Sequence, residues 1–164
     1  MKYIFYNDFT TQLENCANTI WNGANGFCLN EKNEICIVWE KEKGEWNLPG
    51  GGKEENETPL ETFIREVQEE TQCEPLNISY FHAVYAKLFD DIMQEVEGAP
   101  PQYGFRFICR LESILEFVPR KNETEIDERK FVPLDELPHY IPWLADSENG
   151  RESFTEFKKR ILLM

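Results

Sequence analysis

Several features that define common protein classes are missing from this sequence. It contains no GxxxxGKS/T, GxGxxG or GxSxG run, which argues against P-loop, dinucleotide-binding and serine-hydrolase sites of those types. No apolar stretch approaches the length of a membrane-spanning helix or of a signal-peptide core, so we expect a cytoplasmic protein with no membrane partner. No repeat, low-complexity tract or linker divides the chain, so we expect one domain over residues 1–164.

Basic residues are also scarce. The chain has 17 Lys and Arg against 31 Asp and Glu, and its formal net charge is −14. Binding to nucleic acids or to anionic membranes depends on clustered Lys and Arg, so we expect no nucleic-acid partner. A phosphate-bearing ligand would be repelled unless cations bridged the two negative partners. The composition therefore predicts cation dependence for any such ligand, and it leaves the oligomeric state open.

Metal-binding thiols and imidazoles are few. The five cysteines form no CxxC pair, and their odd number favours reduced, mostly buried thiols over a disulfide framework. His82 and His139 are the two histidines of the sequence, which leaves little support for a zinc site.

The hydrophobic pattern predicts an α/β fold. Asn25–Leu29 and Ile35–Glu40 read as a hairpin joined by a polar turn. Further expected elements are an edge strand near Tyr3 and Phe5, long strands at Ile78–Phe89 and Tyr103–Leu111, a continuation of the sheet at Phe117–Asn122, and a helix from about Arg151 onward. This last helix should cover the sheet on the face opposite the first helix.

The first helix should begin after Thr58. Thr58 is a capping residue, Pro59 suits the first helical position, and Glu61 follows three residues after the cap. An apolar stripe formed by Leu60, Phe63, Ile64 and Val67 predicts the buried face.

Three carboxylates, Glu66, Glu69 and Glu70, should lie together on one flank of this helix, about a quarter turn or more from the apolar stripe. Clustered hard oxygen donors suit Mg²⁺ or Mn²⁺. The alternative is an ordinary solvated acidic face. The preceding Gly50, Gly51 and Gly52 permit a close approach of the backbone to a ligand, which makes Gly51 and Gly52 candidate substrate-binding residues.

The spacing of these residues resembles the signature of the Nudix hydrolases. Gly51 is followed after five residues by Glu57, and after seven more by Arg65, Glu66, Val67, a spacer, Glu69 and Glu70. The resemblance implies an α/β/α sandwich with a mixed β-sheet between helices. It also implies a MutT-like hydrolase that uses Mg²⁺ or Mn²⁺ to cleave a nucleoside diphosphate linked to another group.

The resemblance also assigns roles to individual residues. Glu66, Glu69 and Glu70 would ligate the metal with the Gly50 carbonyl, and Arg65 and Glu57 would hold the glutamates in place. The general base is left open among Glu66, Glu125 and Glu128. Gln72 and Cys73 depart from the pattern, because the family usually has glycine and an aliphatic residue there; we expect a cost at the end of the helix with the chemistry retained.

The substrate pocket is less well defined by the sequence. Candidate aromatic platforms for a nucleobase are Phe27, Tyr103, Tyr140 and Trp143. Arg106 and Arg110 share one strand face and could reach a phosphate, although pairing with carboxylates is commoner.

Three functional hypotheses follow. A nucleoside triphosphate pyrophosphohydrolase, acting for instance on oxidised nucleotides, is the first, and an ADP-ribose type nucleotide-sugar pyrophosphatase is the second. A Nudix-like module that senses a nucleotide without cleaving it is the alternative from another class.

Overall fold

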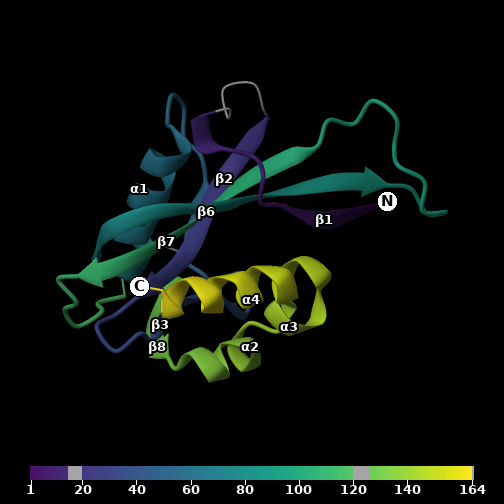
Figure 1. The fold of residues 1–164 in the computed structure, drawn as a ribbon. Helices are drawn as coiled ribbons and strands as arrows, with labels where there is room; N and C mark the ends of the chain where they lie inside the picture. Colours follow the sequence, from purple (N-terminus) through teal and green to yellow (C-terminus); the bar gives the residue numbers. More distant parts are fainter. Residues whose placement is uncertain (15–19, 120–125, 164) are drawn as a thin grey trace.

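The structure, a computed structural model, describes residues 1–14, 20–119 and 126–163. Its strands are β1 Lys2–Asp8, β2 Trp21–Leu29, β3 Ile35–Glu40, β4 Glu45–Asn47, β5 Gly50–Gly52, β6 Glu74–Phe89, β7 Gln102–Glu112 and β8 Ile126–Val132. Its helices are α1 Pro59–Thr71, α2 Leu137–Tyr140, α3 Trp143–Asp146 and α4 Glu148–Leu162, and a 3₁₀ turn covers Leu134–Glu136 (Figure 1).

The described strands form one mixed sheet of eight strands. Neighbours follow the order β1-β6-β7-β2-β3-β4, with β5 paired to β2 and β8 paired to β3. β2 and β7 run parallel, whereas β1–β6, β6–β7 and β2–β3 are antiparallel. The short glycine strand β5 pairs Gly50 with Asn25, so it lies against a strand that is itself flanked by β7 and β3.

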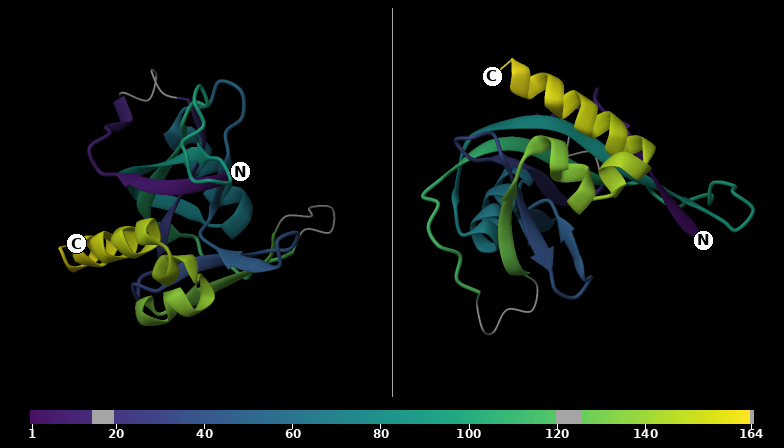
Figure 2. Two further views of the ribbon diagram at one scale, coloured as in Figure 1. Left: turned by 90° about the vertical axis from the view of Figure 1, so that its right-hand side faces the viewer. Right: turned by 90° about the horizontal axis from the view of Figure 1, so that it is seen from below.

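The two faces of the sheet carry separate cores. On β2, Phe27 and Leu29 pack with Phe157 of α4, whereas Cys28 packs with Phe63 of α1 on the other face. This alternation follows from the two-residue period of a strand. Figure 2 shows α4 across one face of the long strands and α1 against the opposite face. The predicted α/β/α arrangement is confirmed, with α4 opposite α1.

The start of α1 is as predicted, and its buried face is so in part, because Phe63 and Val67 are fully buried. Thr58 accepts from the Glu61 amide, and both halves of the capping box are present. Leu60, which we placed in the apolar stripe, is 38% exposed. The buried residues of α1 follow one helical stripe: Pro59, Thr62, Phe63, Glu66, Val67, Glu70 and Thr71. The stripe that faces the sheet is therefore rotated toward the glutamates, two of which lie within it.

Other expectations met mixed outcomes. The predicted hairpin is present as β2 and β3, with β2 beginning earlier, at Trp21, and the edge strand is present as β1. The expected strand at Phe117–Asn122 is wrong for residues 117–119, which have no regular structure, and residues 120–122 lie outside the described part. α4 begins at Glu148 because Ser147 caps it, three residues before the predicted start.

Four cysteines have been placed by the structure. Cys28, Cys36, Cys73 and Cys109 are buried and free, which confirms the prediction for them; Cys16 lies outside the described residues. Among the helices that the structure describes, none is both long enough and apolar enough to cross a bilayer.

Gln72 ends α1 in the left-handed conformation. Its φ is 58° and its ψ is 29°, and its amide donates to the Gln68 carbonyl. The side-chain amide of Gln72 also binds both backbone groups of Val118, donating at 2.7 Å and accepting at 3.1 Å. The side chain that replaces the usual glycine thus fastens the segment after β7 to the end of α1.

Replacing Gln72 by glycine or by alanine separates these two effects. Both variants lose the bonds to Val118, but only glycine relieves the left-handed backbone. We expect Gln72→Gly to be more stable than Gln72→Ala by about 1 kcal/mol in urea denaturation. Equal stability of the two variants would show that position 72 carries no backbone strain.

Candidate functional site

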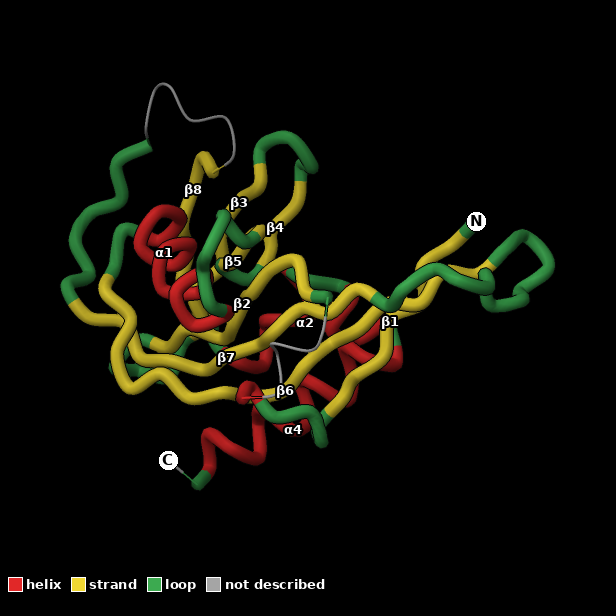
Figure 3. Tube along the Cα trace, turned by 90° about the horizontal axis from the view of Figure 1, so that it is seen from above, coloured by secondary structure: helices red, strands yellow, loops and turns green. Residues whose placement is uncertain are grey.

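The glycine strand β5 lies beside α1 (Figure 3), and at Gly51 no side chain would fit between them. A Cβ on Gly51 would lie 2.6 Å from the carboxylate carbon of Glu66. Next to it, the Gly50 amide donates to Glu70 Oε1 at 2.7 Å. Glu66 and Glu70 are 8% and 6% exposed. Glycine at this strand therefore allows two buried carboxylates to lie against the backbone.

Arg65 holds the acidic residues around it. It donates to both carboxylate oxygens of Glu57, at 2.8 and 2.9 Å, and to the Gly52 carbonyl at 2.8 Å. Its Nη1 donates to Glu66 Oε1 at 2.8 Å and to Glu69 Oε2 at 3.2 Å. These five contacts engage every arm of the guanidinium, and the hydrogen bond with Glu57 raises the pKa of Arg65. Arg65 is thus a fixed anchor between β5 and α1.

Glu57 is the principal partner of that anchor. Its hydrogen bonds from Arg65 lower the pKa of the Glu57 carboxyl from 4.5 to about 2. Thr62 Oγ1 also donates to it at 3.1 Å. Glu57 therefore remains ionised at any ordinary pH and keeps Arg65 oriented toward Glu66 and Glu69, as the carried-over roles require.

The predicted metal ligands, Glu66, Glu69 and Glu70, lie on the same part of α1, but their carboxylates do not surround a common point. Within the described residues, no group of three or more His, Cys, Asp or Glu side chains is arranged to hold a metal ion. Glu66 and Glu69 share Arg65, whereas Glu70 is bound to the Gly50 amide. The donor set still fits magnesium, because it consists of carboxylates on one helix beside a backbone that offers further oxygen atoms.

The candidate bases differ in their position. Glu66 lies at Gly51, inside the group just described. Glu128 is exposed on β8, where it pairs with Trp39 of β3, and it makes none of the contacts to Arg65. Glu125 lies outside the described residues.

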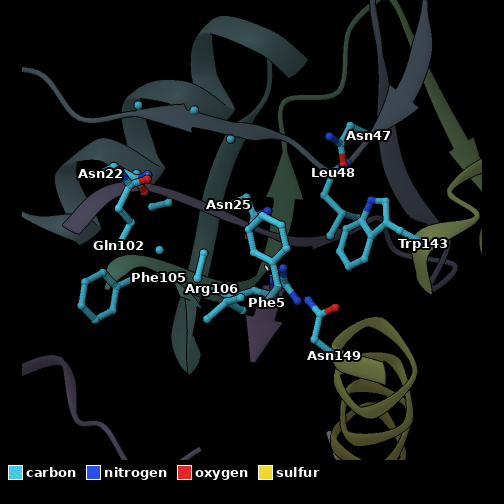
Figure 4. Close-up of a pocket in the computed structure, with 18 of the residues that line it drawn as sticks. Phe5, Asn22, Asn25, Asn47, Leu48, Gln102, Phe105, Arg106, Trp143 and Asn149 are labelled. Carbon is cyan, nitrogen blue, oxygen red and sulfur yellow. Dashed lines mark hydrogen bonds between the residues drawn. The ribbon is translucent and has the colours of Figure 1, made fainter. Parts of the chain in front are cut away.

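A cavity of about 700 Å³ opens on the other side of β5, over the sheet face that carries α4. Gly50, Gly51 and Gly52 line one end of it. Small residues of the sheet line it, namely Ala24, Ala86 and Gly104. Side chains that carry amides also line it, among them Asn22, Asn47 and Asn149 (Figure 4). A cavity of this size, largely apolar with a few polar groups, is typical of a small-molecule site.

The aromatic residues of the cavity are mostly not those predicted. Trp143 lines it, as proposed, but Phe27 is fully buried and stacked on Phe157 at 4.1 Å between ring centres. Tyr103 and Tyr140 are not among the lining residues. Tyr3 and Phe5, which we expected in an edge strand, line the cavity and are 48% and 55% exposed. Their two-residue spacing indicated a shared face, but nothing local indicated what lay over it.

The two arginines of β7 do not pair with carboxylates among the described residues, contrary to the commoner expectation. Arg110 donates to the Asn30 carbonyl at 3.1 Å and to the Asn33 side chain, which ties it to the turn after β2. Arg106 lines the cavity and is 5% exposed. Its partners are the Asn25 and Ser153 side chains.

Comparison with known proteins agrees with this geometry. Residues 21–155 match the NUDIX domain family. Nudix hydrolase 6 of Arabidopsis thaliana is 31% identical over 137 residues, which are 77% of this chain and 43% of that protein. An RNA pyrophosphohydrolase of Bartonella henselae is 30% identical over 140 residues, 77% of this chain and 75% of that one.

A solved structure, the pyrophosphohydrolase BsRppH of Bacillus subtilis, shares the fold with a TM-score of 0.67 at 13% identity, covering 95% of this chain and 90% of that one. The chain spans less than half the length of the first two curated relatives, 43% of Nudix hydrolase 6 and 41% of Nudix hydrolase 5 from the same plant. With the family match covering most of the sequence and the glutamates of α1 held against β5, the chain belongs to the Nudix hydrolase family.

Proposed function

We propose that this protein is a Mg²⁺-dependent pyrophosphohydrolase whose substrate is a nucleoside triphosphate. One observation carries the proposal. On one side of β5 lie the carboxylates of Glu66, Glu69 and Glu70, which we call the acidic group, and on the other side lies the cavity. Gly50, Gly51 and Gly52 line the cavity, and the same three residues contact Glu70, Glu66 and Arg65. A nucleoside in the cavity would therefore present its phosphates to the glycines and, beyond them, to the glutamates.

The residues of this group would divide the work as follows. Arg65, fixed by Glu57, positions Glu66 and Glu69. Glu66, Glu69 and Glu70 would hold Mg²⁺, which supplies neutralisation of charge on the phosphate oxygens and activation of water. Glu66 is the favoured proton acceptor, because its carboxylate lies at Gly51, where the cavity meets the acidic group.

Other substrates in the same class remain alternatives. A nucleotide sugar of the ADP-ribose type would also place a diphosphate at β5. One relative is named an RNA pyrophosphohydrolase, so a triphosphate at an RNA 5′ end is a further candidate. The net charge of −14 disfavours long nucleic acids. A sensor without turnover is the alternative from another class.

A nucleotide panel tests the proposal. We expect Mg²⁺-dependent release of pyrophosphate or phosphate from nucleoside triphosphates, with slower release from ADP-ribose and from a 5′-triphosphorylated RNA. Glu69→Gln and Glu70→Gln should each lower turnover by at least about tenfold, because each replaces a negatively charged metal ligand with a neutral amide. Binding of a nucleotide with no turnover at any Mg²⁺ concentration would favour the sensor.

Two neighbouring glycines give a matched test of Glu66. A methyl group at Gly51 would lie 2.6 Å from the Glu66 carboxylate, whereas one at Gly52 would meet its nearest atom at 3.6 Å. Because the carboxylate can move aside, we expect Gly51→Ala to fold but to lose turnover by about 10- to 100-fold. Gly52→Ala should lose less turnover than Gly51→Ala, because its methyl group meets no carboxylate. Equal activity of the two variants would contradict the role of Glu66.

The ion pair of Glu57 predicts a pH-dependent contribution to stability. Since the pKa of Glu57 falls from 4.5 to about 2 on folding, its contribution is complete above pH 4.5 and is lost as the pH falls toward 2. The melting temperature of the unmodified protein should therefore exceed that of Glu57→Gln by a constant margin above pH 5, and the margin should shrink below pH 4.5. A margin that is constant over the whole range would contradict the ion pair.

A further inference from the structure

Arg106 is a charged side chain of the cavity that the proposed chemistry does not use. It is 5% exposed, and its Cζ lies 5.1 Å from the centre of the Trp143 ring. Its Nε donates to Asn25 Oδ1 at 3.1 Å and its Nη1 donates to Ser153 Oγ at 2.9 Å. A guanidinium has five N–H groups, so donors remain for another partner. In the described part of the chain, no carboxylate is paired with it.

The neighbours of Arg106 fix its orientation and keep its charge. Ser153 Oγ lies 3.1 Å from His82 Nε2, and Asn7 Oδ1 lies 3.0 Å from the same nitrogen. Burial lowers the pKa of His82 to about 2, so this imidazole is neutral beside the guanidinium. Burial also lowers the pKa of Arg106 to about 10, which leaves it protonated at neutral pH. The cavity therefore contains a rigid, charged fork of donors.

The register of the sheet places Arg106 in one row with the glycine strand. Gly50 pairs with Asn25, and Asn25 pairs with Arg106, so the three residues form one row across β5, β2 and β7. Two strand separations place the β7 backbone about 10 Å from the β5 backbone. From β7 the Arg106 side chain reaches Asn25 on the intervening strand, so its guanidinium belongs to the same cavity that the glycines line.

The chemistry of the cavity wall suits the edge of a base better than a second phosphate. The other polar side chains that line the cavity are mainly neutral amides, namely Asn22, Asn25, Asn47, Gln102 and Asn149. The other cation that lines the cavity, Lys43, is paired with Glu40 at 3.2 Å. The exposed rings of Tyr3 and Phe5 add apolar surface on which a flat base can stack.

We propose that Arg106 is a specificity-determining residue whose free N–H groups bind two adjacent acceptors of a 6-oxopurine, the O6 and N7 atoms of guanine or hypoxanthine. This proposal rests on the proposed function. Arginine forms such paired bonds with guanine through its planar fork. Adenine presents an amino donor in place of O6, so its donor would meet the donors of Arg106 and both would be left without a partner.

Binding of four nucleoside monophosphates tests this directly on the unmodified protein. Calorimetry in Mg²⁺ would compare GMP, IMP, AMP and 7-deaza-GMP, none of which has a phosphoanhydride bond that could be hydrolysed. We expect GMP and IMP to bind about 10- to 100-fold more tightly than AMP, and 7-deaza-GMP to lose affinity because it lacks the N7 acceptor. AMP binding within about twofold of GMP would overturn the proposal.

A pair of arginine variants assigns the preference to one side chain. Arg106→Met should bring the GMP and AMP affinities together, and Arg106→Lys should restore little, because an ammonium lacks the fork. Arg110→Met is the matched control on the same strand and face, outside the cavity, and it should keep the preference for GMP. If a folded Arg106→Met variant still binds GMP more tightly than AMP, the assignment of the preference to Arg106 is wrong. If that variant does not fold, the comparison of the four nucleotides on the unmodified protein still tests the proposal.

The outcomes separate this inference from the proposed function. Preferential binding of GMP without hydrolysis of any nucleotide in Mg²⁺ would refute the pyrophosphohydrolase and support the role of Arg106. Equal binding and equal hydrolysis of guanine and adenine nucleotides would refute the role of Arg106 and support the pyrophosphohydrolase.

Discussion

The close approach of β5 to α1 is the constraint on which the candidate site depends. Side chains on Gly50 or Gly51 would collide with Asn25 or with Glu66, so the backbone itself forms the partition between the acidic group and the cavity. A ligand at these glycines would therefore lie next to the strand that contacts Glu66 and Glu70. The position of β5 is set by its pairing with β2, a strand with neighbours on either side, which makes the site a feature of the sheet rather than of a loop.

That approach requires α1 to bury acids. Glu66 and Glu70 lie in the stripe that faces the sheet, where an unpaired carboxylate would be costly. Each has a donor, Arg65 for Glu66 and the Gly50 amide for Glu70. Such departures from the hydrophobic pattern concentrate at functional sites, because function and not stability requires them. The buried glutamates are thus better evidence of a site than an exposed acidic flank would have been.

The same departure explains where the sequence was a good guide and where it was not. Thr58 and Pro59 located the start of α1, since capping is local chemistry. The buried stripe of α1 was misplaced at Leu60 because it was predicted from the spacing of apolar residues, and this method leaves out buried glutamates. The cavity was harder still: Asn7 and Ser153, which meet below it, are 146 residues apart in sequence. Carboxylates are the commoner partners of arginine and were expected for Arg106, but the fold supplied an amide and a hydroxyl.

The two arginines of the site, Arg65 and Arg106, use their positive charge in different ways, in a chain of net charge −14. Arg65 is engaged by three glutamates and a carbonyl, so its charge is already neutralised and serves to position carboxylates. Arg106 has neutral partners and retains donors at the cavity. Attraction for the phosphates must then come from cations taken from solution, whereas recognition of the rest of the substrate can come from the protein. Because these two tasks rest on different residues on opposite sides of β5, base preference can change without altering the metal chemistry.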